Sequence, residues 1–125
     1  MQLIKFTSEH EWLRIEDDGN VTVGITDYAQ QQLGDIVYVE FPEVGAQFDS
    51  TANLAVIESV KAVGEIKMPL AGVVVEINTR LANEPELVNR DPQGEGWLLR
   101  ATLEDSVALG GLMDAAAYAT YVAGL

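Results

Sequence analysis

Residues 54–68, LAVIESVKAVGEIKM, contain the pattern that decides the fold. Leu54 to Ile57 is an apolar run that predicts a buried strand, and Val63 to Met68 predicts the strand that pairs with it. Between them, Glu58 to Ala62 reads as the turn of a β-hairpin with Lys61 at its tip. Because a lysine ammonium is strongly hydrated and rarely buried without a partner, we expect Lys61 to be exposed.

Lys61 has two interpretations. An exposed amine on a rigid turn is what an enzyme that attaches a group to a lysine could recognise. A solvated turn residue without a function is the ordinary reading of a hairpin lysine. The chain has only three lysines, Lys5, Lys61 and Lys67, so the hairpin turn holds a single cation.

Short strand-like runs separated by glycine, proline, asparagine and aspartate extend outward from the hairpin in both directions. The further predicted strands are Glu11 to Glu16, Val21 to Ile25, Ile36 to Phe41, Gly45 to Phe48, Gly72 to Asn78 and Trp97 to Leu103. The run Asp17-Asp18-Gly19-Asn20 predicts a turn between the first two.

Helices are predicted to be few and short. Thr26 can cap a helix over Asp27 to Leu33 that ends at Gly34, and Asp114 can cap another over Ala115 to Ala123. Pro85 to Val88 suggests one further helical turn. In the last helix Tyr118, Tyr121 and Val122 form an apolar stripe that we expect to pack on the sheet.

Two segments on either side of the hairpin resemble each other. Residues 34–40 and 72–78 each begin with glycine, continue as a branched-aliphatic strand and end in polar residues. This repeat is short, but Lys61 lies between its copies, as expected if two similar halves meet at a central hairpin. We therefore expect one mainly β domain over residues 1–125.

The composition, 48% hydrophobic and 22% charged, is that of an ordinary folded domain. No apolar run approaches the roughly 18 residues of a membrane span. Residues 1–6 lack the basic start and long apolar region of a secretory signal, so the cytoplasm is the expected location. With no cysteine, the chain has no disulfide, thiolate metal site or cysteine nucleophile.

The net charge of −13 argues against nucleic acid as a partner, because that affinity depends on lysine and arginine contacting phosphates. The same charge favours partners with basic docking surfaces, although it also simply promotes solubility.

No segment predicts an active site. His10, the only histidine, lacks an orienting carboxylate on its own side of a strand, so a structural or surface role is favoured. The residues do not cluster as metal ligands, and neither Gly94-Glu95-Gly96 nor Gly110-Gly111 has the context of a phosphate-binding loop. A carrier is therefore the sharpest functional hypothesis.

The sequence resembles the H-protein family of the glycine cleavage system. The matching stretches lie in the family's order over nearly the whole chain: His10-Glu11-Trp12, Gly24 to Gln30, Leu33-Gly34-Asp35, Pro42 to Gly45, Glu58 to Ala62, Pro69, Gly72, Pro85 to Asn89, Asp91-Pro92 and Gly96-Trp97. Each is weak alone, but the set is specific.

The resemblance implies a flattened β-barrel or sandwich of two similar halves, like lipoyl and biotinyl domains, with a lipoyl group amide-linked to Lys61. The hairpin residues that attaching enzymes would recognise are Glu58, Ser59, Val60 and Ala62. The implied protein is a non-catalytic monomer that shuttles an aminomethyl group. Its implied partners are a pyridoxal-phosphate glycine decarboxylase, an aminomethyltransferase, a dihydrolipoyl dehydrogenase and lipoate-attaching enzymes.

The resemblance also implies a surface cleft that protects the loaded arm. Glu11 and Glu65 stand where acidic residues are expected, and Gln32 where some members carry histidine. A carboxylate near a primary amine would hold its ammonium form, although a solvated surface is the alternative for both glutamates. Lys67-Met68 superficially resembles a biotin-attachment motif, but Lys67 lies well inside the predicted strand.

Two rival functions stay open from the sequence. The chain could be a lipoate donor or store for 2-oxoacid dehydrogenase domains, which would use the same lysine. It could also be an interaction module that has lost its modification.

Overall fold

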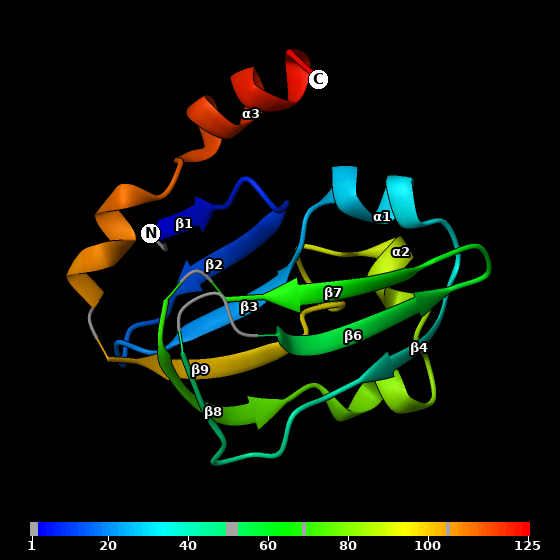
Figure 1. The fold of residues 1–125 in the computed structure, drawn as a ribbon, viewed down its shortest axis with the longest axis horizontal. Helices are drawn as coiled ribbons and strands as arrows, with labels where there is room; N and C mark the ends of the chain where they lie inside the picture. Colours follow the sequence, from blue (N-terminus) through cyan, green and yellow to red (C-terminus); the bar gives the residue numbers. More distant parts are fainter. Residues whose placement is uncertain (1–2, 50–52, 69, 105) are drawn as a thin grey trace.

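The computed structural model describes residues 3–49, 53–68, 70–104 and 106–125, and these form two β-sheets with short helices around them (Figure 1). The strands are β1 (Leu3–Phe6), β2 (Glu11–Ile15), β3 (Val21–Ile25), β4 (Ile36–Glu40), β5 (Gln47–Phe48), β6 (Asn53–Ser59), β7 (Val63–Lys67), β8 (Gly72–Ile77) and β9 (Leu99–Leu103). The helices are α1 (Asp27–Leu33), η1 (Thr79–Ala82), α2 (Leu87–Arg90), η2 (Ser106–Gly111) and α3 (Ala115–Ala123). No described helix is long and apolar enough to cross a membrane.

The larger sheet has the strand order β1-β2-β3-β9-β8-β5, and the smaller has the order β4-β6-β7. All the strand pairs are antiparallel. The predicted mainly β, flattened sandwich is confirmed, but the described strands do not close into a barrel. The repeated segments become β4 and β8, one in each sheet, on either side of the Lys61 hairpin.

The core is apolar and draws on both sheets. Every residue of β3 is buried, and Ile57 of β6 and Val74 of β8 are fully covered in the same cluster. Burying a side chain of this size stabilises the fold by about 1.5–3 kcal/mol, so the core supplies most of the driving force. Gly24 in β3 leaves room for the Trp12 indole, which lies 2.6 Å from where a Cβ would stand.

Both predicted helix caps are confirmed. Thr26 accepts a hydrogen bond from the N–H of Ala29, and Asp114 accepts one from the N–H of Ala117. Gly34 ends α1 with a φ of 82°, a conformation that side chains other than glycine rarely adopt. Local capping chemistry therefore fixes where α1 and α3 begin.

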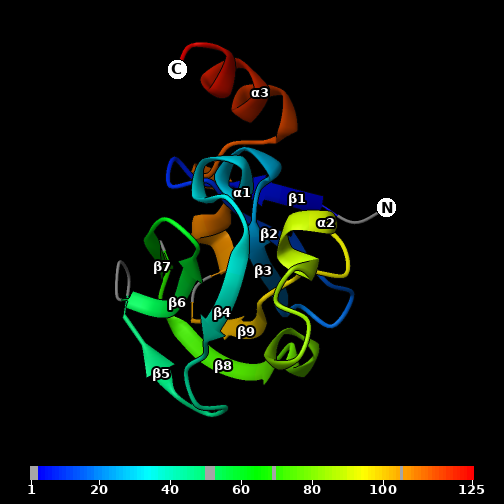
Figure 2. The same cartoon turned by 90° about the vertical axis from the view of Figure 1, so that its right-hand side faces the viewer.

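Helix α3 lies at one end of the molecule, beyond α1 and β1 (Figure 2). Tyr118 is buried and stacks on Phe6 with ring centroids 4.7 Å apart, and Val122 packs against the same cluster. Tyr121, which we expected to pack on the sheet with them, is 37% exposed. The stripe is therefore narrower than predicted, because one buried tyrosine already supplies the main contact with β1.

Three predicted segments differ from the structure. Gly45 to Phe48 shortens to β5, which pairs with β8 in the larger sheet, because Gly45 adopts a φ of 92° that breaks the extended run. The Trp97 strand begins at Leu99, since the carbonyl of Trp97 accepts from the Asn78 side chain. The helical turn at Pro85 begins at Leu87, because Pro85 first forms a turn with Val88.

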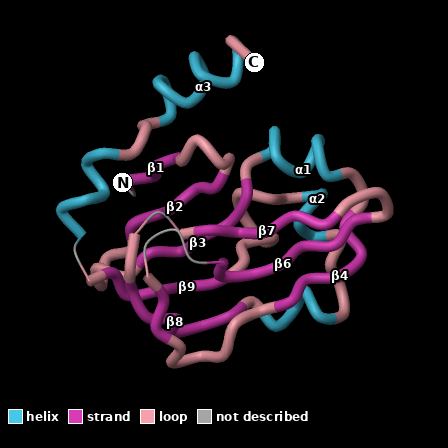
Figure 3. Tube along the Cα trace, viewed as in Figure 1, coloured by secondary structure: helices cyan, strands magenta, loops and turns pink. Residues whose placement is uncertain are grey.

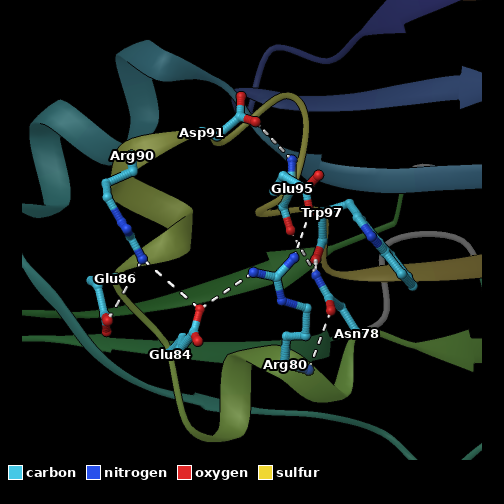
Figure 4. A network of polar contacts seen from close by, with 8 residues as sticks. All are labelled: Asn78, Arg80, Glu84, Glu86, Arg90, Asp91, Glu95 and Trp97. Atoms are coloured by element: carbon cyan, nitrogen blue, oxygen red, sulfur yellow. Dashed lines mark hydrogen bonds and ion pairs between the residues drawn. The ribbon is translucent and has the colours of Figure 1, made fainter.

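The segment between β8 and β9 is held by polar contacts (Figure 4). Asn78 donates to the carbonyls of Glu95 and Trp97 over 2.9 and 2.8 Å, and Arg80 pairs with Glu84 and Glu95. Such exposed ion pairs contribute little individually, so we assign this network to loop structure.

Candidate functional site

The β6–β7 hairpin presents Lys61 on a tight, hydrogen-bonded turn. The N–H of Ser59 donates to the carbonyl of Ala62 over 2.8 Å. The Ser59 hydroxyl accepts from the N–H groups of Ala62 and Lys61, over 3.0 and 3.3 Å, and donates to the Ala62 carbonyl. The turn backbone is thus fixed while the Lys61 side chain is exposed to solvent.

The hairpin tip is tied to the end of α1 and the start of β4. The N–H of Val60 donates to the carbonyl of Asp35 over 3.0 Å. Below that contact, Asn89 of α2 accepts from the N–H of Ile36 over 2.8 Å and donates to the carbonyl of Gly34 over 2.9 Å. These contacts connect α1, α2 and β4 beneath the turn, so the base of Lys61 is rigid.

The aliphatic stem of Lys61 passes over Gly34. A Cβ built on Gly34 would lie 3.3 Å from Cε of Lys61 and 3.7 Å from its Cδ. Glycine therefore suits this position for two reasons. It adopts the positive φ at the end of α1, and it has no side chain that would crowd the stem of Lys61. Among the described residues, no carboxylate forms an ion pair with Lys61.

The four predicted recognition residues surround this amine. Val60 is 68% exposed and Ala62 is also exposed, whereas Glu58 and Ser59 are half-buried at the end of β6. The structure therefore brings all four together around Lys61, as the hairpin prediction required. Lys67 lies at the other end of β7, with an exposed side chain.

A cavity of about 440 Å³ opens near that other end of β7. Its lining comes from the β1–β2 connection, the end of β7 and the segment after η2: Phe6, Thr7, Ser8, Glu9, Glu11, Lys67, Met68, Gly111, Leu112 and Met113. The cavity is thus a mainly apolar space with one buried carboxylate, that of Glu11.

Glu11 is only 1% exposed, which excludes the solvated-surface interpretation for this glutamate. One carboxylate oxygen accepts from the Thr7 hydroxyl over 3.3 Å, and the other accepts from the N–H of Lys67 over 3.0 Å. Burial raises the pKa of Glu11 from 4.5 to about 7, although the two hydrogen bonds oppose the shift. Its protonation therefore changes near neutral pH.

The other predicted cleft residues do not line this cavity. Gln32 is exposed on α1, and Glu65 is exposed on β7. Only Glu11 of the three is placed in the cavity, so the structure does not gather them into one polar cluster.

His10 has a structural environment, as the sequence favoured. Its Nδ1 lies 2.8 Å from the Tyr118 hydroxyl, which lies 2.7 Å from the Thr26 hydroxyl. The ring also contacts Tyr28 and Tyr121, and burial lowers the pKa of His10. His10 thus links α3 to the start of α1.

Sequence reasoning missed two residues that support these features. Asn89 stood in a matching stretch, but nothing local shows that it bonds to α1 and β4, more than fifty positions away. Thr7 holds Glu11 through its hydroxyl, and a threonine four residues before a glutamate is too common a pattern to single out. Pro69, one of the matching residues, lies outside the described residues.

Comparisons with known proteins give a consistent result. The family model described as glycine cleavage H-protein matches residues 4–124. A glycine cleavage system H protein of Marinobacter nauticus is 50% identical over 120 residues, covering 96% of this chain and 92% of the relative. One of Chromobacterium violaceum is 52% identical over 116 residues, covering 93% and 91%.

A solved structure agrees with them. The crystal structure of a glycine cleavage system H protein from Mycobacterium marinum superposes with a TM-score of 0.87 at 36% identity, covering 98% of this chain and 97% of the other. A flattened β-sandwich that presents a hairpin lysine defines the class of small carrier proteins. Within that class, the chain belongs to the glycine cleavage H-protein family. It is a lipoyl carrier that shuttles intermediates in the glycine cleavage system.

Proposed function

We propose that Lys61 is the attachment point of the lipoyl group, through an amide bond to its Nζ. The observation that carries this proposal is an exposed amine on a turn whose backbone is fixed by Ser59 and by the Asp35 carbonyl. A rigid base lets a mobile arm reach several enzymes from one defined origin, which raises its effective concentration at each.

The environment of Lys67 makes it the poorer candidate. Its backbone N–H is bonded to the buried Glu11 carboxylate, and the residue ends β7 beside the cavity. An attaching enzyme would have to approach a strand rather than a projecting turn. Biotin on Lys67 has no support in this geometry.

The cavity suits the attached group. A lipoyl chain and its dithiolane are apolar, and Phe6, Met68, Leu112 and Met113 provide apolar walls. When bound, the lipoyl group supplies a disulfide that accepts the aminomethyl cargo. The Lys61 turn and the cavity stand at opposite ends of β7, so the arm would lie along that strand.

Glu11 provides the polar contact in this proposal. An amine brought into the cavity is charged at neutral pH, and a buried carboxylate would hold its ammonium by a charge-assisted hydrogen bond. A nearby cation favours the ionised carboxyl, so cargo binding would lower the raised pKa of Glu11. With a pKa of about 7, Glu11 is about half protonated at neutral pH when the cavity is empty, and the proton that it carries would be released when the cargo enters.

The proposed partners are the other enzymes of the system. A decarboxylase would load the aminomethyl group, an aminomethyltransferase would remove it, and a dihydrolipoyl dehydrogenase would reoxidise the dithiol. The chain itself would catalyse none of these steps. Its net charge of −13 favours brief docking on basic surfaces.

The first prediction tests the site directly. Lys61→Arg keeps the charge but removes the acylable amine, so the protein produced with lipoate and a lipoate ligase should lose the lipoyl mass increment and support no glycine–bicarbonate exchange. Folding should be retained, because the side chain is exposed. Lys67→Arg is the matched control for attachment and should keep the lipoyl mass increment. A lipoyl increment that persists in Lys61→Arg would show that the site is elsewhere.

A further inference from the structure

The outer face of the three-stranded sheet lies directly beside Lys61. Between its strands, Val39 and Ile57 are cross-strand partners that point into the core and are buried. Because successive side chains of a strand point to opposite faces of the sheet, the residues just before and just after this pair on each strand point outward. We define the outer face as Tyr38, Glu40, Val56, Glu58, Val63 and Glu65.

Each outward row crosses all three strands. One row is Tyr38–Glu58–Val63, nearer the turn, and the next is Glu40–Val56–Glu65. Figure 3 shows β4, β6 and β7 running side by side toward the hairpin tip, and in Figure 1 they lie in front of β3 and β9. In this direction of view, which Figures 1 and 3 share, no described element lies in front of β6 and β7.

Large apolar side chains on this face are unusually exposed. Tyr38 is 52% and Val63 is 65% exposed, and Val37 and Val60 extend the apolar surface beside the turn at 52% and 68%. Exposed tyrosine and clustered aliphatic groups are typical of surfaces that bind another protein.

Carboxylates alternate with these apolar groups. Among the described residues, Glu40, Glu58 and Glu65 form no ion pair. The lysines that flank them are Lys61 at the turn and Lys67 at the other end of β7. An apolar surface with three unpaired carboxylates is complementary to a partner protein's surface that is also apolar and is bordered by arginine or lysine.

We propose that the outer face docks the enzyme that forms the amide bond at Lys61, through a basic and apolar surface on that enzyme. The inference rests on the proposed attachment at Lys61. Before attachment the chain has no lipoyl arm to be recognised, so the enzyme must choose one of three lysines from the protein surface alone. Lys61 is the lysine at the turn that this face adjoins.

The reaction at the docked turn is an acyl transfer. With lipoate and ATP as substrates, the Lys61 amine attacks the carbonyl carbon of a lipoyl adenylate. The amide C–N bond forms, the mixed-anhydride C–O bond breaks, and AMP leaves with that electron pair while the amine proton passes to solvent. No oxidation or reduction occurs, so the outer face contributes only position.

The experiment uses the full chain, a lipoate ligase, lipoate and ATP, with intact mass as the readout. Glu40→Lys/Glu65→Lys should lower kcat/KM for attachment about tenfold through KM, because charge reversal removes electrostatic attraction. Asp17→Lys/Glu104→Lys is the matched control, with the same charge change at exposed positions outside the outer face, in the β2–β3 turn and just after β9. It should react like the parent chain.

A small reagent separates docking from chemistry. Acylation of Lys61 by an N-hydroxysuccinimide ester of acetate needs no docking, so its rate should be the same in the parent chain and in both variants. It is followed on the peptide that contains Lys61, because the added lysines of the variants also react. Tyr38→Ser should raise KM as well, since it removes an apolar contact without changing charge. If the double reversal does not fold, Glu40→Gln/Glu65→Gln replaces it and should give a smaller rise in KM.

Several outcomes would overturn the docking proposal. Equal KM in the outer-face variant and its control would do so, as would slower attachment through kcat alone. A parent-chain dimer that dissociates in Tyr38→Ser would assign the face to a second copy. If the outer-face variant is attached normally but is used more slowly by the glycine decarboxylase, the outer face would be assigned to that enzyme. An unmodified parent chain would instead refute attachment itself, which keeps the two proposals distinguishable.

Discussion

At the scale of single residues, Glu11 shows how burial sets chemistry. Its carboxyl has two hydrogen-bond donors, Thr7 and the Lys67 backbone, yet its pKa is raised to about 7. Loss of hydration therefore outweighs both hydrogen bonds and the Lys67 charge, with Glu9 adding a smaller repulsion. The residue is poised to exchange a proton near neutral pH, which is where an amine cargo would use it.

This raised pKa predicts a pH dependence of stability. The folded protein binds the Glu11 proton more tightly than the unfolded chain, so the free energy of unfolding should fall as pH rises from 4.5 to 7. At about 1.4 kcal/mol per pKa unit, ionising the buried carboxyl costs roughly 3 kcal/mol. Glu11→Gln cannot ionise and should lack this decrease. Urea unfolding of both proteins between pH 4.5 and 8 measures the difference.

Burial also lowers the pKa of His10, but this residue is common to both proteins, so the difference between their curves isolates Glu11. If the two curves run parallel from pH 4.5 to 8, Glu11 ionises at the same pH in the folded and unfolded states, and its proposed role in holding a proton fails.

At the scale of elements, the hairpin depends on helices that are distant in sequence. Asn89 of α2 bonds to Gln30 of α1, to Gly34 just after α1 and to the first amide of β4. Asn89→Ala would remove all three contacts and leave the amide of Ile36 without its partner. We expect a loss of about 2 kcal/mol in the free energy of unfolding.

The same substitution should speed hydrogen exchange at the amides of Ile36 and Val60. The Ile36 amide loses its acceptor on Asn89, and the Val60 amide is bonded to the carbonyl of Asp35, the residue just before Ile36. Asn83→Ala, at an exposed asparagine just after η1, is the control and should change neither quantity. Equal exchange rates in Asn89→Ala and the parent chain would show that α2 does not support the turn.

Helix α3 offers a second test at this scale. The Tyr118 hydroxyl contacts His10 and Thr26, so Tyr118→Phe should destabilise the protein by about 1–2 kcal/mol and loosen α3. Tyr121→Phe removes only one exposed, 3.4 Å contact to the Ser8 carbonyl and should cost much less. Denaturant unfolding checks both, and equal losses would contradict this docking of α3.

Elements were predictable where local chemistry decides them. Caps at Thr26 and Asp114 and the apolar runs around Lys61 determined α1, α3 and the hairpin from nearby residues alone. The starts of α2 and β9 were displaced because their ends are set by contacts with other segments, such as Asn78 with Trp97. Strand β1 was not among the predicted strands; its last residue, Phe6, is held by bridge and ring contacts with Met113 and Tyr118, more than one hundred positions away.

In the candidate site too, local features were predictable from the sequence and features made by distant segments were not. Lys61 and its turn were predictable because a hairpin is a local structure. The cavity was not, because its walls come from three segments that only the fold brings together, and Glu65 and Gln32 were grouped with Glu11 without that information. Burial of Glu11 was likewise decided by the approach of Lys67 and Thr7, not by its neighbours in sequence.

At the scale of the whole molecule, the two sheets have different tasks. The smaller sheet carries Lys61 and the exposed outer face, while the larger sheet supplies much of the buried core and holds Glu11 at the start of β2. The cavity forms where the end of β7 meets the larger sheet. In the proposed function, the reactive group lies outside the polypeptide, and the fold would anchor it at Lys61 and shelter it in the cavity.

Peptide mapping by tandem mass spectrometry tests the attachment at Lys61 most directly. The parent chain, lipoylated with a lipoate ligase, lipoate and ATP, should carry one lipoyl increment, on the peptide containing Lys61 and on that lysine alone. An increment on Lys5 or Lys67, or a chain that stays unmodified while a control lipoyl domain is fully modified, would contradict the proposal.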